Sequence, residues 1–114
     1  MPNKKNTNKG ISKKLDLSSY EKHLKKYRLL IDKIDRQLLA LLKKRFYYAP
    51  KIAVLKFKYH QPFYQKQRWI KMLKERLVIS NKYSLDQKMV KKILTHIHVE
   101  SIKLQKKHVS RIKK

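Results

Sequence analysis

Residues 20–59 read YEKHLKKYRLLIDKIDRQLLALLKKRFYYAPKIAVLKFKY, and a stripe of mostly apolar residues recurs along them at alternating steps of three and four. Its members are Leu24, Tyr27, Ile31, Ile34, Leu38, Leu41, Arg45, Tyr48, Ile52, Leu55 and Tyr59. This spacing keeps one face of an α-helix apolar and is typical of a coiled-coil seam. A helix of about 40 residues is roughly 60 Å long, more than twice the size of a compact domain of this chain length. We therefore expect a second chain alongside it.

Pro50 lies inside this stripe. Proline removes one backbone donor, and its ring crowds the carbonyl group of Phe46, at a cost of about 3 kcal/mol in a helix interior. The stripe nevertheless continues in phase on both sides of Pro50. The pattern predicts one kinked helix rather than two separate helices.

The other helix boundaries are predicted from capping patterns and breaks. Ser18 and Glu21 have the spacing of a capping box, which predicts the start of the first helix. A second helix is expected from Phe63 to about Ile79, after a break at residues 60–62. A turn at residues 81–83 then leads to a second capping box, formed by Ser84 and Gln87, which predicts the start of a third helix.

The chain is expected to form one helical domain at residues 18–109. Residues 1–17 are polar and basic, have no periodicity and include Gly10, so we expect a disordered tail. Residues 110–114 are expected to form a second basic tail. One glycine and three prolines leave little material for tight turns, which disfavours a strand-rich fold. The predicted fold class is all-α, with a long kinked first helix in a three-helix chain.

The composition limits the possible functions. Lys and Arg number 32 against 7 Asp and Glu, which gives a net charge of +25. Such a surface is compatible with nucleic acid, an anionic lipid or an anionic metabolite. The absence of cysteine excludes a disulfide scaffold, a thiolate metal site and a cysteine nucleophile. The apolar runs are too short for a signal peptide or a membrane span, so we expect a cytoplasmic protein without a membrane partner.

Arg45 is the one charged residue in the long stripe. A buried guanidinium is costly unless it is paired, and Lys56 faces the same side about 16 Å further along the helix. Neither cation has an acid within four residues, since the acids of this helix are Glu21, Asp32 and Asp35. The simplest counter-charge is an exogenous anion. The alternative is that Lys56 extends to solvent and Arg45 lies at the edge of the stripe.

The third predicted helix adds neutral groups and no metal site. Ser101 and Gln105 are one turn apart and offer hydrogen-bond donors, although such pairs are more often on the surface. His96 and His98 point about 200° apart on a helix and cannot chelate one metal ion. There is no glycine-rich phosphate loop and no carboxylate pair for acid–base chemistry. We therefore expect neither a metal nor another cofactor.

Residues 27–46, YRLLIDKIDRQLLALLKKRF, resemble the opening helix of the all-helical chorismate mutases of the AroQ class. The resemblance extends over about residues 20–108, and its further matches are Lys56, Pro62, Arg68 and the stretch ESIKLQ at residues 100–105. Charged and polar residues at fixed places on three helices make this set fairly specific. The family implies an intertwined homodimer with two active sites, each of which borrows one arginine from the other subunit.

The borrowed arginine would be Arg28. Arg28 and Arg45 are seventeen residues apart, which is about 25 Å on a continuous helix. One small substrate cannot span that distance. Only an antiparallel or crossed partner helix could bring a second Arg28 to a pocket around Arg45.

The resemblance further implies the conversion of chorismate to prephenate, a Claisen rearrangement in phenylalanine and tyrosine biosynthesis that needs no cofactor. Arg28 of the second subunit and Arg45 would hold the substrate carboxylates. Lys56 and Gln105 would face the ether oxygen of the breaking bond and offset its negative charge. Arg68, Ser101 and Gln65 would complete the substrate contacts.

The sequence departs from the family at two places. Trp69 follows Arg68 where the family commonly has an acid that contacts the substrate hydroxyl, and an indole cannot accept a hydrogen bond. We expect Trp69 to pack between helices. Gln65 replaces a frequent acid just upstream and can still accept through its amide oxygen. The two replacements are compatible with a reduced activity.

Two other functions remain open from the sequence. An isochorismate-pyruvate lyase uses the same fold, and an apolar residue after Arg68 is less surprising there, although Ser101 argues modestly against it. A basic helical dimer could instead bind nucleic acid through phosphate contacts, with a steep salt dependence. Weak adventitious binding of nucleic acid is expected in any case, and no base-reading motif is present.

Overall fold

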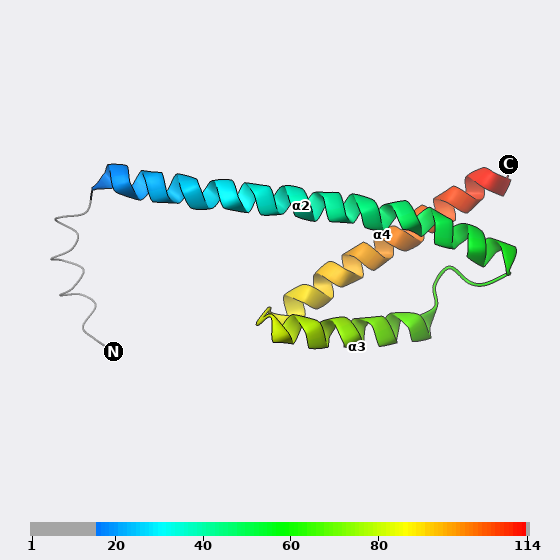
Figure 1. Ribbon diagram of the computed structural model, residues 1–114. Helices are drawn as coiled ribbons and strands as arrows, with labels where there is room; N and C mark the ends of the chain where they lie inside the picture. Colours follow the sequence, from blue (N-terminus) through cyan, green and yellow to red (C-terminus); the bar gives the residue numbers. More distant parts are fainter. Residues whose placement is uncertain (1–15, 114) are drawn as a thin grey trace. The chain divides into compact units, whose positions relative to one another are not determined.

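The computed structural model describes residues 16–113, which fold into three helices without a strand (Figure 1). Helix α2 spans Leu17–Lys58, α3 spans Lys66–Lys82, and α4 spans Gln87–Lys113. The prediction of an all-α, three-helix chain is thereby confirmed. Most of the expected N-terminal tail lies outside the described residues. The chain divides into two units at Leu41 and Leu42, inside α2.

Helix α2 is continuous through Pro50, so the prediction of one helix rather than two is confirmed. Its start differs from the prediction. The backbone N–H of Ser18 donates a hydrogen bond of 3.0 Å to Oδ1 of Asp16, so Asp16 caps the helix and the predicted Ser18–Glu21 capping box is wrong. An aspartate carboxylate is a good cap because it accepts from the free amides and also interacts favourably with the positive end of the helix dipole.

Helix α4 is capped in the same way. The backbone N–H of Met89 donates to Oδ2 of Asp86 at 2.9 Å, and the predicted Ser84–Gln87 capping box is wrong. Ser84 has a positive φ of 57° and lies in the turn before the helix. The side chain of Gln87 donates to Oγ of Ser80 at 2.6 Å and thereby ties α4 to the end of α3. At its other end α4 continues to Lys113, so residues 110–113 extend the helix.

Helix α3 begins three residues later than predicted and also ends three residues later. Phe63 lies outside it, in the connection from α2, and its backbone carbonyl accepts a hydrogen bond from Nζ of Lys56 in α2. Gln65 is the extended N-cap residue of α3 and makes no side-chain capping bond. The hydrogen bond to Phe63 ties the connection between α2 and α3 to the C-terminal part of α2.

The second unit consists of the C-terminal part of α2 together with α3 and α4. Its buried apolar side chains are Ala49, Ala53, Met72 and Val109. Small side chains at Ala49 and Ala53, one turn apart on α2, let another helix approach closely. Figure 1 shows α4 crossing this part of α2, and two hydrogen bonds between the two helices, described below, confirm their contact. This crossing brings polar groups of α4 opposite the two cations of α2.

The first unit contains the N-terminal part of α2, whose apolar stripe is exposed. Tyr27, Ile31, Ile34, Leu38 and Leu41 each retain more than half of their accessible surface. Most of the stability of such a helix must come from packing of its apolar face. Within residues 16–113, no helix is both long and apolar enough to cross a bilayer.

Candidate active site

A cavity of about 360 Å³ lies in the second unit, among the C-terminal part of α2, α3 and α4. Small-molecule sites generally occupy roughly 300–1,000 Å³. Four cations line it, together with six neutral side chains that carry a polar group: Arg45, Lys56, Arg68 and Arg76, and Tyr48, Gln65, Trp69, His98, Ser101 and Gln105. None of the lining residues is an acid. The cavity is therefore suited to an anionic ligand.

Arg45 is held at the cavity by α4. Its Nη1 donates a hydrogen bond of 2.8 Å to Oγ of Ser101, which is buried. Burial lowers the pKa of Arg45, and the nearby guanidinium groups of Arg76 and Arg68 lower it further. The charge of Arg45 is thus partly desolvated and surrounded by like charges, a combination that a bound carboxylate would relieve.

Lys56 makes the second connection between α2 and α4. Its Nζ donates to Oε1 of Gln105 at 2.9 Å and also to the backbone carbonyl of Phe63. Burial lowers the pKa of Lys56. An ammonium group has three hydrogens, so one remains for a ligand. Because Oε1 of the buried Gln105 accepts from Lys56, the amide NH₂ of Gln105 is the group left to donate in the cavity.

Trp69 and His98 form one wall of the cavity. Their rings stack with centroids 4.3 Å apart and an angle of 21° between the planes, and Tyr64 contacts His98 edge-on at 5.7 Å. Trp69 therefore packs between α3 and α4, as expected. Nε2 of His98 is enclosed without a hydrogen-bond partner among the described residues. Burial lowers the pKa of His98, and the charges of Arg45 and Lys56 lower it further.

This environment predicts a loss of stability at acid pH. The pKa of His98 in the folded state lies below its ordinary value of 6.5, so the unfolded chain takes up a proton first as the pH falls. Above pH 6.5 the imidazole is neutral in both states, and the stabilisation is lost as the pH falls from 6.5 through the folded-state pKa. Urea unfolding at a series of pH values measures this slope.

The variant His98→Phe keeps an aromatic ring against Trp69 and removes the titrating nitrogen. Its free energy of unfolding should depend less on pH in that window than the free energy of the wild type does. His96→Phe, which changes an exposed histidine on the same helix, is the matched control and should retain the wild-type slope. Equal slopes for the wild type and His98→Phe would contradict this assignment.

Six of the seven predicted substrate-binding residues line the cavity, namely Arg45, Lys56, Gln65, Arg68, Ser101 and Gln105. Arg28, the seventh, does not. It lies in the first unit, in a shallow surface depression of α2 beside Glu21 and Asp32. From residue 16 to residue 113, no group of three His, Asp or Glu side chains could hold a metal ion.

Arg76 and His98 also line the cavity and were not predicted as site residues. The spacing of their neighbours could have identified both. Trp69, Met72 and Arg76 follow one another at steps of three and four, so they share a face of α3, and Gln65 precedes Trp69 by four residues. In the same way His98 precedes Ser101 by three residues and Gln105 by seven on α4. One further helical step, from Met72 to Arg76 and from Ser101 back to His98, adds the residue that was missed on each helix.

Comparison with protein families identifies the class of protein that this cavity defines. The family model for chorismate mutase type II matches residues 27–106, which include Arg28 and every polar residue of the cavity. The chain belongs to the chorismate mutase type II family. The resemblance found in the sequence is thereby confirmed. Neither a curated protein nor a solved structure gave a significant match.

Proposed function

We propose that this chain is a chorismate mutase that converts chorismate into prephenate, a step in phenylalanine and tyrosine biosynthesis. The observation that carries the proposal is the pair of contacts Arg45–Ser101 and Lys56–Gln105, which direct two cations from α2 into one cavity without an acid. Membership of the chorismate mutase type II family supports the same function.

The chemistry of the reaction suits such a cavity. Chorismate is a dianion with two carboxylates and an enolpyruvyl ether. In the rearrangement the ether C–O bond breaks while a C–C bond forms between the enolpyruvyl group and the ring, and the electrons move in one cycle. No nucleophile or proton transfer is needed. A catalyst must hold the compact conformer and stabilise the negative charge that develops on the ether oxygen.

The cavity residues can divide these tasks. Arg45, oriented by Ser101, would bind one carboxylate through its remaining N–H groups, and Arg68 would contribute to binding the other. The free hydrogen of Lys56 and the amide of Gln105 would donate to the ether oxygen. Gln65, which also lines the cavity, would accept a hydrogen bond from the ring hydroxyl.

A second copy of the chain would complete the site. The exposed stripe of the first unit offers an apolar face 18 residues long, from Leu24 to Leu41, for a helix of that copy. Arg28 lies on this segment and is not one of the residues that line the cavity. We therefore propose an intertwined homodimer in which each cavity receives Arg28 of the partner.

The test is an assay of the purified protein with chorismate. We expect chorismate to disappear and prephenate to accumulate in equal amount, with the protein dimeric by light scattering. The same assay with isochorismate tests the lyase alternative, whose products are salicylate and pyruvate. A folded dimer that forms no prephenate would contradict the proposed function.

A further inference from the structure

Three guanidinium groups face the same cavity. Arg45 comes from α2, while Arg68 and Arg76 lie eight residues apart on α3. Arg76 is half-buried, whereas Arg68 is exposed. Of these two neighbours, Arg76 has the larger effect on the pKa of Arg45. Arg45 and Arg76 therefore bring two like charges from separate helices to the same cavity.

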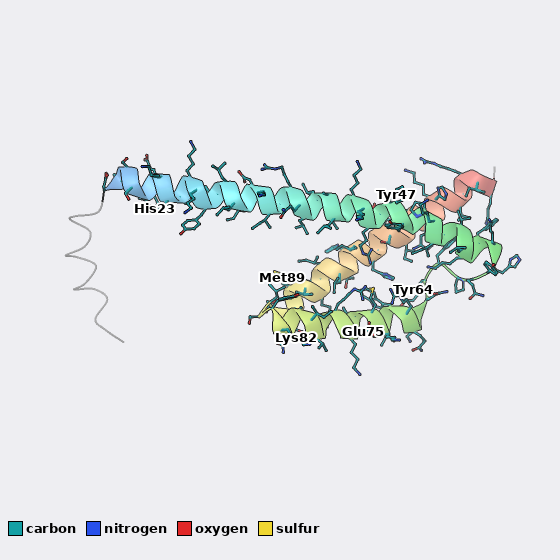
Figure 2. The ribbon with its side chains drawn as sticks, viewed as in Figure 1. His23, Tyr47, Tyr64, Glu75, Lys82 and Met89 are labelled. Atoms are coloured by element: carbon teal, nitrogen blue, oxygen red, sulfur yellow. The ribbon has the colours of Figure 1, made fainter. Side chains whose placement is uncertain are left out.

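Among residues 16–113, no acid lines the cavity beside these two groups. Glu75, labelled in Figure 2, precedes Arg76 directly, but its side chain is exposed and does not line the cavity. Like charges that share a partly desolvated space repel one another, and the repulsion is only weakly screened there. The arrangement is favourable only when an anion lies between the two cations.

The position of Arg76 is fixed by the packing of α3. Met72, one turn earlier on the same face, is buried among the helices. The side chains four residues apart on a helix lie on one side, so the burial of Met72 directs Arg76 toward the cavity. Arg45 is fixed as well, because one of its nitrogens is bound to Ser101. Two guanidinium groups on separate, packed helices are a preformed clamp for a planar carboxylate.

We propose that Arg76 is a further substrate-binding residue and clamps one carboxylate of the substrate together with Arg45. This inference rests on the proposed function, which supplies a substrate with two carboxylates. It gives the cavity two positions for carboxylates: the Arg45–Arg76 pair within the chain, and a second position completed by Arg68 and Arg28 of the partner. Arg76 binds the carboxylate equally in the substrate and the transition state, so it acts mainly on substrate affinity.

The test compares Arg76→Gln with Lys74→Gln, which removes the same charge from an exposed position on α3 outside the cavity. For Arg76→Gln we expect KM for chorismate to rise roughly ten- to a hundredfold, as for the loss of a charge-assisted hydrogen bond, with a much smaller change in kcat. Arg76→Lys should recover only part of the affinity, because an ammonium group cannot bind a carboxylate bidentately. Lys74→Gln should retain the wild-type KM.

Thermal unfolding gives a second readout that does not depend on turnover. Without a ligand, Arg76→Gln should unfold at the wild-type temperature or higher, since a repulsion is removed. With a bicyclic ether dicarboxylate that mimics the transition state, its Tm should rise less than the Tm of the wild type or of Lys74→Gln.

Each outcome has a distinct meaning. An equal KM and an equal ligand-induced rise in Tm for Arg76→Gln and Lys74→Gln would overturn the role of Arg76. A lower Tm of the free variant with an unchanged KM would also overturn it, because that result defines a structural residue. A wild type that is stabilised by the dicarboxylate but does not convert chorismate would overturn the proposed function, while the rise in Tm would still decide the role of Arg76.

Discussion

Replacing Lys56 by alanine should lower kcat for chorismate by roughly a hundred- to a thousandfold, the loss typical of removing one preorganised donor from a developing oxyanion. Lys56 is the cation whose free hydrogen remains for the ether oxygen, and burial strengthens its electrostatic effect. KM should change less than kcat, because negative charge on this oxygen is greater in the transition state than in the substrate. Steady-state kinetics of the purified variant measure both constants.

The substitution also removes the partner of two acceptors, Oε1 of Gln105 and the carbonyl of Phe63. A buried acceptor left without a donor costs about 1–3 kcal/mol, so the variant should be less stable as well. Circular dichroism must therefore confirm that it is folded in the assay. Lys58→Ala, at an exposed position in the last turn of the same helix, is the matched control and should retain wild-type kcat. A folded Lys56→Ala protein with wild-type kcat would refute the role of Lys56.

Replacing Arg45 by alanine should lower kcat/KM by roughly a hundredfold or more, because a bidentate carboxylate contact is lost from the centre of the site. The effect should appear in KM through lost affinity and in kcat through poorer selection of the compact conformer. Arg45→Lys should recover little, since a point charge cannot reproduce the planar fork. Lys44→Ala, which alters the exposed preceding residue, is the matched control. Retention of wild-type kcat/KM in Arg45→Ala would contradict the proposed carboxylate contact.

The sequence predicted the course of the first helix well, since the apolar stripe from Leu24 to Tyr59 extends over many turns and its phase survives Pro50. Helix starts were predicted poorly. At both predicted capping boxes an aspartate two residues away, Asp16 or Asp86, makes the cap instead. Neighbouring candidates for a cap differ little in free energy, and local spacing alone does not distinguish them.

Only part of the candidate site could be predicted, because local spacing does not show which distant residues meet. Arg45 stands out in a single sequence because it is the one charge in an apolar stripe, and Lys56 faces the same side of the helix without an acid nearby. Their partners do not stand out, since Ser101 is 56 residues from Arg45 and Gln105 is 49 residues from Lys56. Contacts at such separations depend on how α4 crosses α2, which helical periodicity does not determine. Arg76 was missed because a basic residue on a short helix of a strongly basic chain attracts no notice.

Complementation between two inactive variants is the most direct test of a site that two chains build together. Arg28→Ala removes the arginine that we assign to the partner's site, and Arg45→Ala disables the cavity itself. Each homodimer should have little activity. In a mixed dimer, the cavity of the Arg28→Ala chain keeps its Arg45 and receives an intact Arg28 from the other chain, so one of its two sites is complete.

The measurement is the chorismate mutase activity of an equimolar mixture after the two variants have been unfolded and refolded together. Random pairing makes about half of the dimers mixed, so about a quarter of all sites should be intact and the mixture should regain about a quarter of wild-type activity. An activity no greater than the mean of the two separate variants would contradict the claim that a second copy completes the site.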